Sequence, residues 1–157
     1  MNLFLILGNQ LFPLDCLRQF KNDHLFYIAE DYELCIFQKH HKQKILLYLS
    51  AMRSYADLLI KNNYNIEYKK IEDKDFKKNY FDKILKIINQ KKINEISSFE
   101  VEDKFFEEKI RKFLNKSKIK WNIIQTPMFL NSRIEFKNYL QKSKKPFMAT
   151  FYKESRK

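Results

Sequence analysis

A chain of 157 residues with 45% hydrophobic side chains is long enough to bury a sizeable core, and this composition excludes a disordered protein. No apolar run approaches the roughly 20 residues of a membrane helix, and the amino terminus lacks the features of a signal peptide. We therefore expect a cytoplasmic protein with no membrane partner, in which Cys16 and Cys35 stay reduced.

The formal net charge of +12 is compatible with nucleic-acid binding through counterion release. The excess, however, is mostly lysine spread along the chain, and the arginines that fork onto phosphates are scattered rather than clustered. Direct binding to DNA is therefore expected to be weak. The two cysteines and three histidines match no metal-ligand spacing, so we expect no metal site.

The predicted elements alternate between strands and helices. The apolar run from Asn2 to Leu7 predicts a strand buried on both faces, which ends at Gly8, the only glycine. Further strands are expected at 25–29, 66–71, 95–99 and 120–125, and helices at 15–20, 34–61, 80–90, 100–115 and 132–141. The third strand alternates in a way that suits a sheet edge, and Ser132 with Glu135 forms a capping box. The helix at 80–90 is expected to bury Phe81, Ile84, Leu85, Ile87 and Ile88.

This alternation predicts an α/β fold, namely a Rossmann-like, doubly wound, five-stranded parallel sheet in the order 3-2-1-4-5. Ligands of such sheets bind outside the carboxyl ends of the strands at the topological switch point. The segments Gly8–Leu11, Glu30–Tyr32 and Phe99–Glu102 should therefore converge on one crevice. Gly8 can take a positive φ or admit a ligand close to the backbone, and Asn9 and Gln10 supply amide groups.

Catalytic motifs are missing from the sequence. With a single glycine there is no glycine-rich phosphate loop, and the motifs of serine hydrolases and zinc deaminases do not occur either. Glu30, Glu33 and Glu100 could perform acid–base chemistry, but solvation at helix starts explains them equally well. We predict no catalytic residue.

A cationic cluster spans Lys39 to Lys44, and His40 and Lys44 share one face if this segment is helical. Two interpretations stay open. The cluster is either a solvated helix face with His41 packed beneath it, or a docking surface for another domain or an anionic ligand.

The end of the chain differs in character. Residues 142–146 are linker-like, and residues 147–152 are aromatic with no predicted element to cover them. We therefore predict a domain at 1–141, followed at 142–157 by a linker and the start of a missing second domain.

Five segments carry a family resemblance. They are Leu5-Ile6-Leu7-Gly8-Asn9-Gln10-Leu11; Glu30; His40-His41-Lys42-Gln43-Lys44-Ile45 with Leu49-Ser50-Ala51-Met52-Arg53; Phe129-Leu130-x-Ser132-Arg133-x-Glu135-Phe136; and Met148-x-x-Phe151-Tyr152-x-Glu154-x-Arg156. In this order they resemble the amino-terminal domain of the deoxyribodipyrimidine photolyase-related proteins. This family comprises the prokaryotic (6-4) photolyases and related iron-sulfur cryptochromes.

The resemblance implies an antenna domain that holds 6,7-dimethyl-8-ribityllumazine in the crevice and passes excitation to FAD in a following helical domain. FAD and a [4Fe-4S] cluster are expected only in that helical half, whether it belongs to the same chain or to a separate one, and DNA is contacted through it. Alone, this chain should not repair DNA. The implied chromophore-binding residues are Gly8, Asn9, Gln10, Leu11, Glu30, Asp31, Tyr32, Leu34, Tyr48 and Glu100. The implied interdomain docking residues are His40, His41, Lys44, Arg53, Phe151, Tyr152 and Arg156.

Several positions depart from the family pattern: Asn9 stands for the usual Asp, Leu34 for a Glu, and Tyr48 for an aliphatic residue, while Val101-Glu102-Asp103-Lys104 replaces a Pro-Gly-Glu-Trp turn. These departures motivate an alternative function as a small nucleotide-binding or regulatory module that keeps the fold without the antenna. A second alternative is a non-specific nucleic-acid-binding accessory protein.

Overall fold

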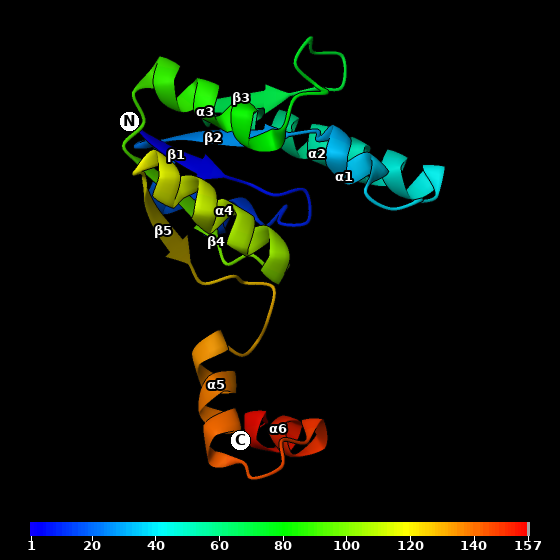
Figure 1. Cartoon of the computed structure of the whole chain (residues 1–157), viewed down its shortest axis with the longest axis vertical. Helices are drawn as coiled ribbons and strands as arrows, with labels where there is room; N and C mark the ends of the chain where they lie inside the picture. The colour runs from blue at the N-terminus through cyan, green and yellow to red at the C-terminus, as the bar shows by residue number, and fades with distance from the viewer. Residues whose placement is uncertain (157) are drawn as a thin grey trace. The chain divides into compact units, whose positions relative to one another are not determined.

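The computed structural model describes residues 1–156 and divides the chain into two compact units, Met1–Ile124 and Gln125–Lys157 (Figure 1). This division precedes the domain boundary expected after residue 141, which stays a prediction. The two units are described separately below.

The first unit is built on a five-stranded sheet in the order β3-β2-β1-β4-β5 with every pairing parallel, which confirms the predicted fold class and strand order. The strands are β1 (Asn2–Leu5), β2 (His24–Ala29), β3 (Ile66–Lys69), β4 (Glu95–Phe99) and β5 (Lys120–Ile124). Strands β1, β3 and β5 end one or two residues earlier than expected. Strand β3 lies at an edge, as its alternating pattern predicted.

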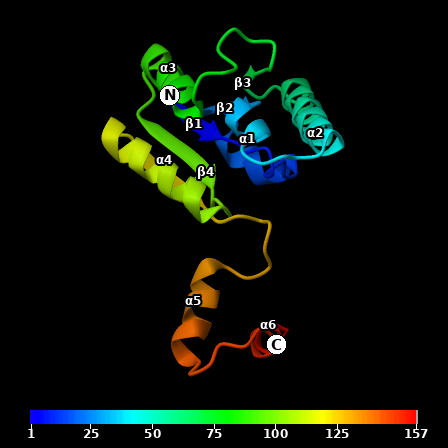
Figure 2. The same ribbon diagram turned by 45° about the vertical axis from the view of Figure 1, so that its right-hand side comes forward.

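Helices cover both faces of the sheet (Figures 1 and 2). They are the 3₁₀ helix η1 (Leu14–Phe20), α1 (Tyr32–Ile36), α2 (Lys42–Lys61), α3 (Tyr80–Lys91) and α4 (Lys104–Ser117). Helices α3 and α4 pack with Leu3, Leu5 and Ile96 on one face. Helix α2 and η1 pack with Phe4, Ile6 and Phe26 on the other. The two apolar faces of β1 and β2 explain why these strands are continuous hydrophobic runs.

The single helix expected from Leu34 to Lys61 was wrong, because the chain forms α1 and α2 with a break at residues 37–41. His41 adopts an extended conformation and caps α2, since its Nδ1 accepts a hydrogen bond from the Gln43 N–H at 3.3 Å. Phe37 is 76% exposed, so continuing the helix through it would gain no packing. His41 is itself exposed, which corrects the interpretation that it packs beneath a helix face.

Helix α3 buries a lysine in place of a leucine. Leu85, expected in the core, is 38% exposed, whereas Lys83 is 1% exposed. The Lys83 ammonium donates to Asp31 Oδ1 and to the Phe76 carbonyl oxygen, each at 3.3 Å. A buried charge is tolerated only with such partners, and these contacts let Lys83 share the inward face of α3 with its buried isoleucines. Helix α4 begins at Lys104, later than expected, because Asp103 caps it by accepting from the Phe106 N–H.

The second unit contains α5 (Arg133–Lys142) and α6 (Met148–Ser155). Ser132 and Glu135 form the predicted capping box at the start of α5. The aromatic segment predicted to lack a covering element forms α6, and its Phe151 ring lies 5.1 Å from the Tyr139 ring. The Tyr139 hydroxyl joins the two helices because it donates to the Phe147 carbonyl oxygen and accepts from the Phe147 N–H. None of the helices in residues 1–156 is long and apolar enough to cross a bilayer.

One buried titratable group makes a testable contribution to stability. His24, at the start of β2, is 9% exposed and lies 3.1 Å from Ser97 Oγ through its Nε2. Burial lowers the pKa of His24 below 6.5, an effect that the Phe20 backbone, Asp23 and Glu95 only partly offset. Between the folded pKa and 6.5 the unfolded chain therefore binds more protons than the folded chain.

We predict that the free energy of unfolding decreases as the pH is lowered through 6.5, by up to about 1.4 kcal/mol per pH unit from this group. Urea unfolding followed by circular dichroism at pH 7.5, 6.5 and 5.5 measures the decrease. His24→Gln should flatten it, whereas the control His40→Gln should retain it. An equal decrease in both variants would contradict the assignment to His24.

Candidate functional site

The three segments expected to form a crevice follow β1, β2 and β4 at the carboxyl edge of the sheet, and side chains of the segment after β1 form hydrogen bonds with the segment after β4. Gln10 is 1% exposed, and its amide nitrogen donates to the Glu100 carbonyl oxygen at 2.8 Å and to both carboxylate oxygens of Glu102. Asn9 donates to Glu102 Oε2 at 3.1 Å. The amide donors predicted to face a ligand thus brace the tips of β1 and β4. The side-chain amide oxygen of Gln10, Oε1, is buried without a hydrogen-bond partner in the described part of the chain.

Gly8 sits in a turn closed by the hydrogen bond from the Gln10 N–H to the Leu7 carbonyl oxygen. The predicted option of a positive φ was wrong, because Gly8 has none. A Cβ at this position would lie 2.9 Å from the Sδ of Met52, so the space above Gly8 is filled by a side chain of α2. Leu11 is partly buried in the same core layer.

Glu30, at the end of β2, is completely buried and accepts four hydrogen bonds. Its Oε1 accepts from Arg53 Nε at 2.6 Å and from the Tyr68 hydroxyl at 2.7 Å. Its Oε2 accepts from Arg53 Nη2 at 2.9 Å and from the Ile71 N–H at 2.7 Å. Arg53 also bridges to the exposed Glu72. The carboxylate therefore ties together the end of β2, helix α2 and the segment that follows β3.

This network keeps Glu30 ionised. Burial alone would raise its pKa, but the hydrogen bonds from Arg53, Tyr68 and the Ile71 backbone outweigh burial and hold the pKa below 4.5. A carboxylate that stays charged and uses its lone pairs internally does not suit proton transfer at neutral pH. Glu30 therefore holds neighbouring elements together and does not suit a role as a general acid at neutral pH.

Asp31 and Tyr32, which follow Glu30, also contact other segments of the protein. Asp31 is 6% exposed and pairs with the buried Lys83. The Tyr32 ring packs edge-on against Phe76 at 5.6 Å. The ion pair thus holds helix α3 to the end of β2, and the aromatic contact holds the loop at 71–79 there, which leaves neither Asp31 nor Tyr32 fully available to a ligand.

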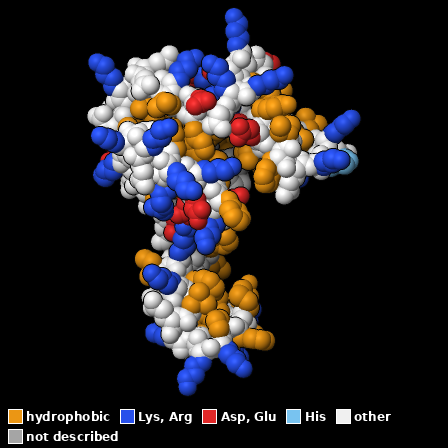
Figure 3. Space-filling model, in the orientation of Figure 1, with side chains coloured by type: hydrophobic (Ala, Val, Ile, Leu, Met, Phe, Trp, Pro, Cys, Tyr) orange, Lys and Arg blue, Asp and Glu red, His pale blue; other side chains and the backbone are white. Residues whose placement is uncertain are grey.

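Apolar side chains beyond the strand tips are exposed. Met52 contacts Gly8, and Tyr48 lies one helical turn earlier on the same side of α2, toward the carboxyl edge of the sheet. Tyr48 is 44% exposed and Leu34 is 58% exposed. Their neighbours Ile36, Phe37, Leu46 and Leu47 are also exposed, and Figure 3 shows hydrophobic side chains at the surface over this region.

The expected docking residues fall into both units. His40, His41 and Lys44 lie around the start of α2 on the surface, while Arg53 is committed to Glu30 and Glu72. Phe151, Tyr152 and Arg156 lie in or next to α6 of the second unit. Of these three, Phe151 contributes to the aromatic cluster with Phe136 and Tyr139.

Sequence reasoning missed three residues that organise this edge, namely Met52, Tyr68 and Lys83, whereas Glu102 lies in a segment expected there. Met52 and Tyr68 are ordinary core and edge-strand residues by pattern, so nothing in the sequence pairs them with Gly8 and Glu30. Lys83 carried a usable signal, because it lies next to Ile84 and one turn before Ile87 on the apolar side of α3. Within residues 1–156, no three His, Cys, Asp or Glu side chains are placed to hold a metal ion, and both cysteines are free.

Comparisons with known proteins agree with the residues that carried the resemblance. The chain is 29% identical over 159 residues to a (6-4) photolyase of Agrobacterium fabrum (strain C58 / ATCC 33970). The alignment covers 99% of this chain and 31% of that protein, so the chain spans about a third of the relative's length. The family model for deoxyribodipyrimidine photo-lyase-related proteins matches residues 4–157. The chain therefore belongs to the deoxyribodipyrimidine photolyase-related protein family.

Proposed function

We propose that this chain is the amino-terminal antenna domain of a photolyase-related protein and binds a ribityllumazine at the carboxyl edge of its sheet. The observation that carries the proposal is the match of nearly the whole chain to about a third of a (6-4) photolyase. The parallel sheet with its switch point between β1 and β4 supports it, because such sheets bind ligands at this edge.

The residues at the edge suit a polar heteroaromatic ring in two respects. The side-chain amide oxygen of Gln10 is a buried acceptor without a partner in the described structure, and a ring N–H or a ribityl hydroxyl would satisfy it. The exposed faces of Tyr48 and Leu34 offer apolar contact for a flat ring. When bound, the chromophore would supply light absorption and excitation transfer. The protein's part would be to hold and orient it.

The partner in this proposal is a helical, FAD-binding half, in the same or a separate chain, which would also hold the [4Fe-4S] cluster. The relative's additional length supports it, as do the apolar surface on α1 and α2 and the exposed Phe129, Leu130 and Ile134 of the second unit. Contact with DNA would occur mainly through that half, and this chain alone would not repair lesions. Both cysteines are unpaired, which fits a reducing cytoplasm.

One observation favours the alternative of a module that has kept the fold but lost the antenna. Asn9, Glu30 and Asp31, which resemblance assigns to the chromophore, all make hydrogen bonds or ion pairs within the protein. A ligand would therefore rely on Gln10 and on apolar contact. Direct binding experiments separate the two functions.

We predict saturable binding of 6,7-dimethyl-8-ribityllumazine to the purified chain, seen as increased fluorescence polarisation of the ligand. Tyr48→Ala should weaken this binding at least about fivefold, because an aromatic stacking contact contributes roughly 1 kcal/mol. The matched control is Ile60→Ala, another exposed apolar position at the other end of the same helix. Absence of binding at high micromolar lumazine, or equal loss in both variants, would rule out the antenna role for this site.

We also predict a graded loss of stability when the Glu30 network is dismantled. Glu30→Gln should cost on the order of 3 kcal/mol, because it places an amide donor against Arg53 or the Ile71 N–H. Tyr68→Phe should cost about 1 kcal/mol. Glu72→Gln, at the exposed end of the network, should change stability by no more than about 0.5 kcal/mol. Urea unfolding at pH 7 measures the series.

The pH dependence of this effect has a defined sign. The folded pKa of Glu30 lies below 4.5, so the advantage of wild type over Glu30→Gln should be complete above that pH and shrink as the pH falls further. An advantage that stayed constant down to pH 3 would show that the carboxylate charge is not what the network stabilises.

A further inference from the structure

The edge of the sheet opposite to the proposed antenna site is basic. It consists of the segments that lead into the strands, residues 1–2, 21–24, 61–66, 91–95 and 116–120, which we call the amino edge. These segments contain two carboxylates, Asp23 and Glu95, and seven lysines: Lys21, Lys61, Lys91, Lys92, Lys116, Lys118 and Lys120. At the carboxyl edge, by contrast, the segments 30–41, 70–79 and 100–104 hold more carboxylates than lysines. Of the two edges, the amino edge thus carries the positive charge.

The strand order distributes these lysines along the whole amino edge. From β3 to β5 the edge presents Lys61, Lys21, the amino terminus, Lys91 with Lys92, and finally the lysines of residues 116–120. Neighbouring strands lie about 4.8 Å apart, so the five strand starts extend over roughly 20 Å. Figure 3 shows Lys and Arg side chains on the side of this unit where Figure 1 places the N-terminus and the start of β5.

Most of these ammonium groups have no carboxylate partner. Lys120 pairs with Glu95 at 2.8 Å, and no other ion pair within residues 1–156 involves a lysine of the amino edge. All of the seven except Lys21 are exposed. Five exposed lysines therefore keep their charge available to an anion: Lys61, Lys91, Lys92, Lys116 and Lys118.

Helix capping explains part of this pattern. A lysine in the last turn of each of α2, α3 and α4 offsets the negative end of the helix dipole. Lys92 and Lys118 differ, because they follow α3 and α4 in the left-handed conformation, with φ of 51° and 54°. Glycine or asparagine is preferred there, and Asn63 takes such a position after α2. Lysine at both positions is unfavourable for the backbone, which points to a use of the charge itself.

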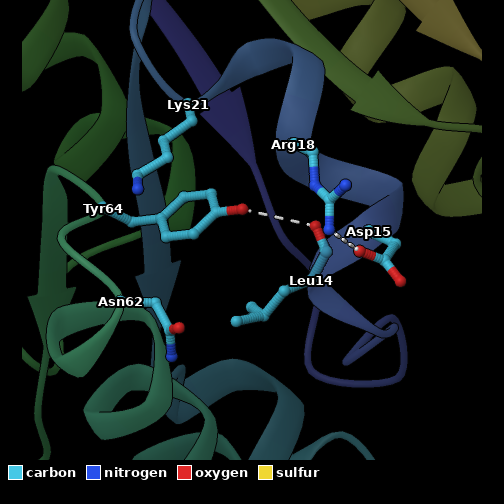
Figure 4. Close-up of a pocket in the computed structure, with 6 residues that line it drawn as sticks. All are labelled: Leu14, Asp15, Arg18, Lys21, Asn62 and Tyr64. Carbon is cyan, nitrogen blue, oxygen red and sulfur yellow. Dashed lines mark hydrogen bonds and ion pairs between the residues drawn. The ribbon is translucent and has the colours of Figure 1, made fainter.

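The pocket at one end of this edge does not add a cavity for a small anion. It is lined by Leu14, Asp15, Arg18, Lys21, Asn62 and Tyr64 (Figure 4). Arg18 pairs with Asp15, and the Lys21 ammonium lies over the Tyr64 ring, 5.3 Å from its centre. Its charged groups and its aromatic ring are thus engaged within the protein. The amino edge is therefore suited to an extended anion that contacts it from outside.

We propose that the amino edge binds the phosphate backbone of duplex DNA without sequence preference. Lysine ammonium groups contact phosphates as point charges and release condensed counterions. The exposed Asn22, Asn65 and Asn94 add donors of the kind that contact phosphates. An edge of roughly 20 Å matches about six base pairs of duplex. This surface is distinct from the antenna site, and its contact with DNA does not depend on lumazine binding.

Two other polyanions fit this surface less well. Single-stranded nucleic acid is held largely by stacking on exposed aromatic rings, whereas the two aromatic side chains of the amino edge, His24 and Tyr64, are buried. Surfaces that bind anionic membranes combine cations with inserted apolar side chains, and the exposed large apolar side chain within these segments is that of Met1.

Fluorescence anisotropy of a labelled duplex of about 20 base pairs, titrated with the whole chain between about 50 and 200 mM NaCl, tests the proposal. The triple variant Lys61→Gln, Lys92→Asn, Lys118→Asn removes charge along the length of the edge. Asparagine suits the left-handed positions, so the fold is retained, and circular dichroism verifies this. We expect the affinity at the lowest salt to fall at least about tenfold, and the slope of log K against log salt to become less steep by roughly 2.

The matched control is the triple variant Lys70→Gln, Lys74→Gln, Lys78→Gln, which removes three exposed lysines at the carboxyl edge and changes the net charge equally. Its affinity should fall less than about twofold, because the removed charges lie more than a Debye length away from the bound phosphates. Saturating lumazine should not change the affinity for DNA, so this test and that of the antenna role succeed or fail separately.

Equal losses in the two triple variants would overturn the proposal, because they would show only a general attraction of anions to a basic protein. Absence of duplex binding at the lowest salt, or an affinity that does not depend on salt, would also contradict it. So would tighter binding of the single strand than of the duplex. A further contradiction would be an amino-edge variant that loses cosedimentation with phosphatidylserine vesicles but binds the duplex as wild type does.

Discussion

The fold of the first unit depends on the buried carboxylate of Glu30. A charge removed from water at the end of β2 is tolerated only when its oxygens are fully hydrogen-bonded, and the chain supplies four donors. Arg53 belongs to α2 and donates from Nε and Nη2 to the two carboxylate oxygens of Glu30, which ties that helix to the end of β2. Met52, the residue before Arg53, contacts Gly8. The absence of a Cβ at Gly8 leaves room for the Met52 sulfur in this arrangement.

Other polar side chains at the carboxyl edge are also paired with each other within the protein. Asp31 with Lys83, and Asn9 and Gln10 with Glu102, join the ends of neighbouring elements through side chains that could otherwise meet a ligand. The edge is consequently rigid and offers few free polar groups. For the proposed chromophore this edge offers the side-chain amide oxygen of Gln10 and an apolar surface, a combination that favours a flat, weakly polar ligand over a highly charged one.

The second unit has only a small hydrophobic core. Its two helices are joined through Tyr139, Phe147 and Phe151, yet Phe136, Leu140, Met148 and Tyr152 stay substantially exposed. A segment of this length buries too little surface to be stable by itself. Its exposed apolar side chains are therefore consistent with a larger partner, in line with the chain's share of its photolyase relative.

The sequence by itself determined the features that depend on local patterns. Buried apolar runs and helical periodicity specified the strands, their parallel order and the edge position of β3, and the Ser132–Glu135 spacing specified the cap of α5. Family membership was also recoverable, because motifs such as His40 to Ile45 keep their order along the chain.

Only the tertiary structure decided which side chains meet at the carboxyl edge. Glu30 with Arg53, Gly8 with Met52, and Asp31 with Lys83 are contacts between distant segments, and no periodic pattern encodes them. The break between α1 and α2 was likewise hidden, because an amphipathic pattern continues through it while Phe37 finds no core to pack against. In each case the deciding term is the burial or satisfaction of one group by a partner from elsewhere in the chain, which only the folded structure supplies.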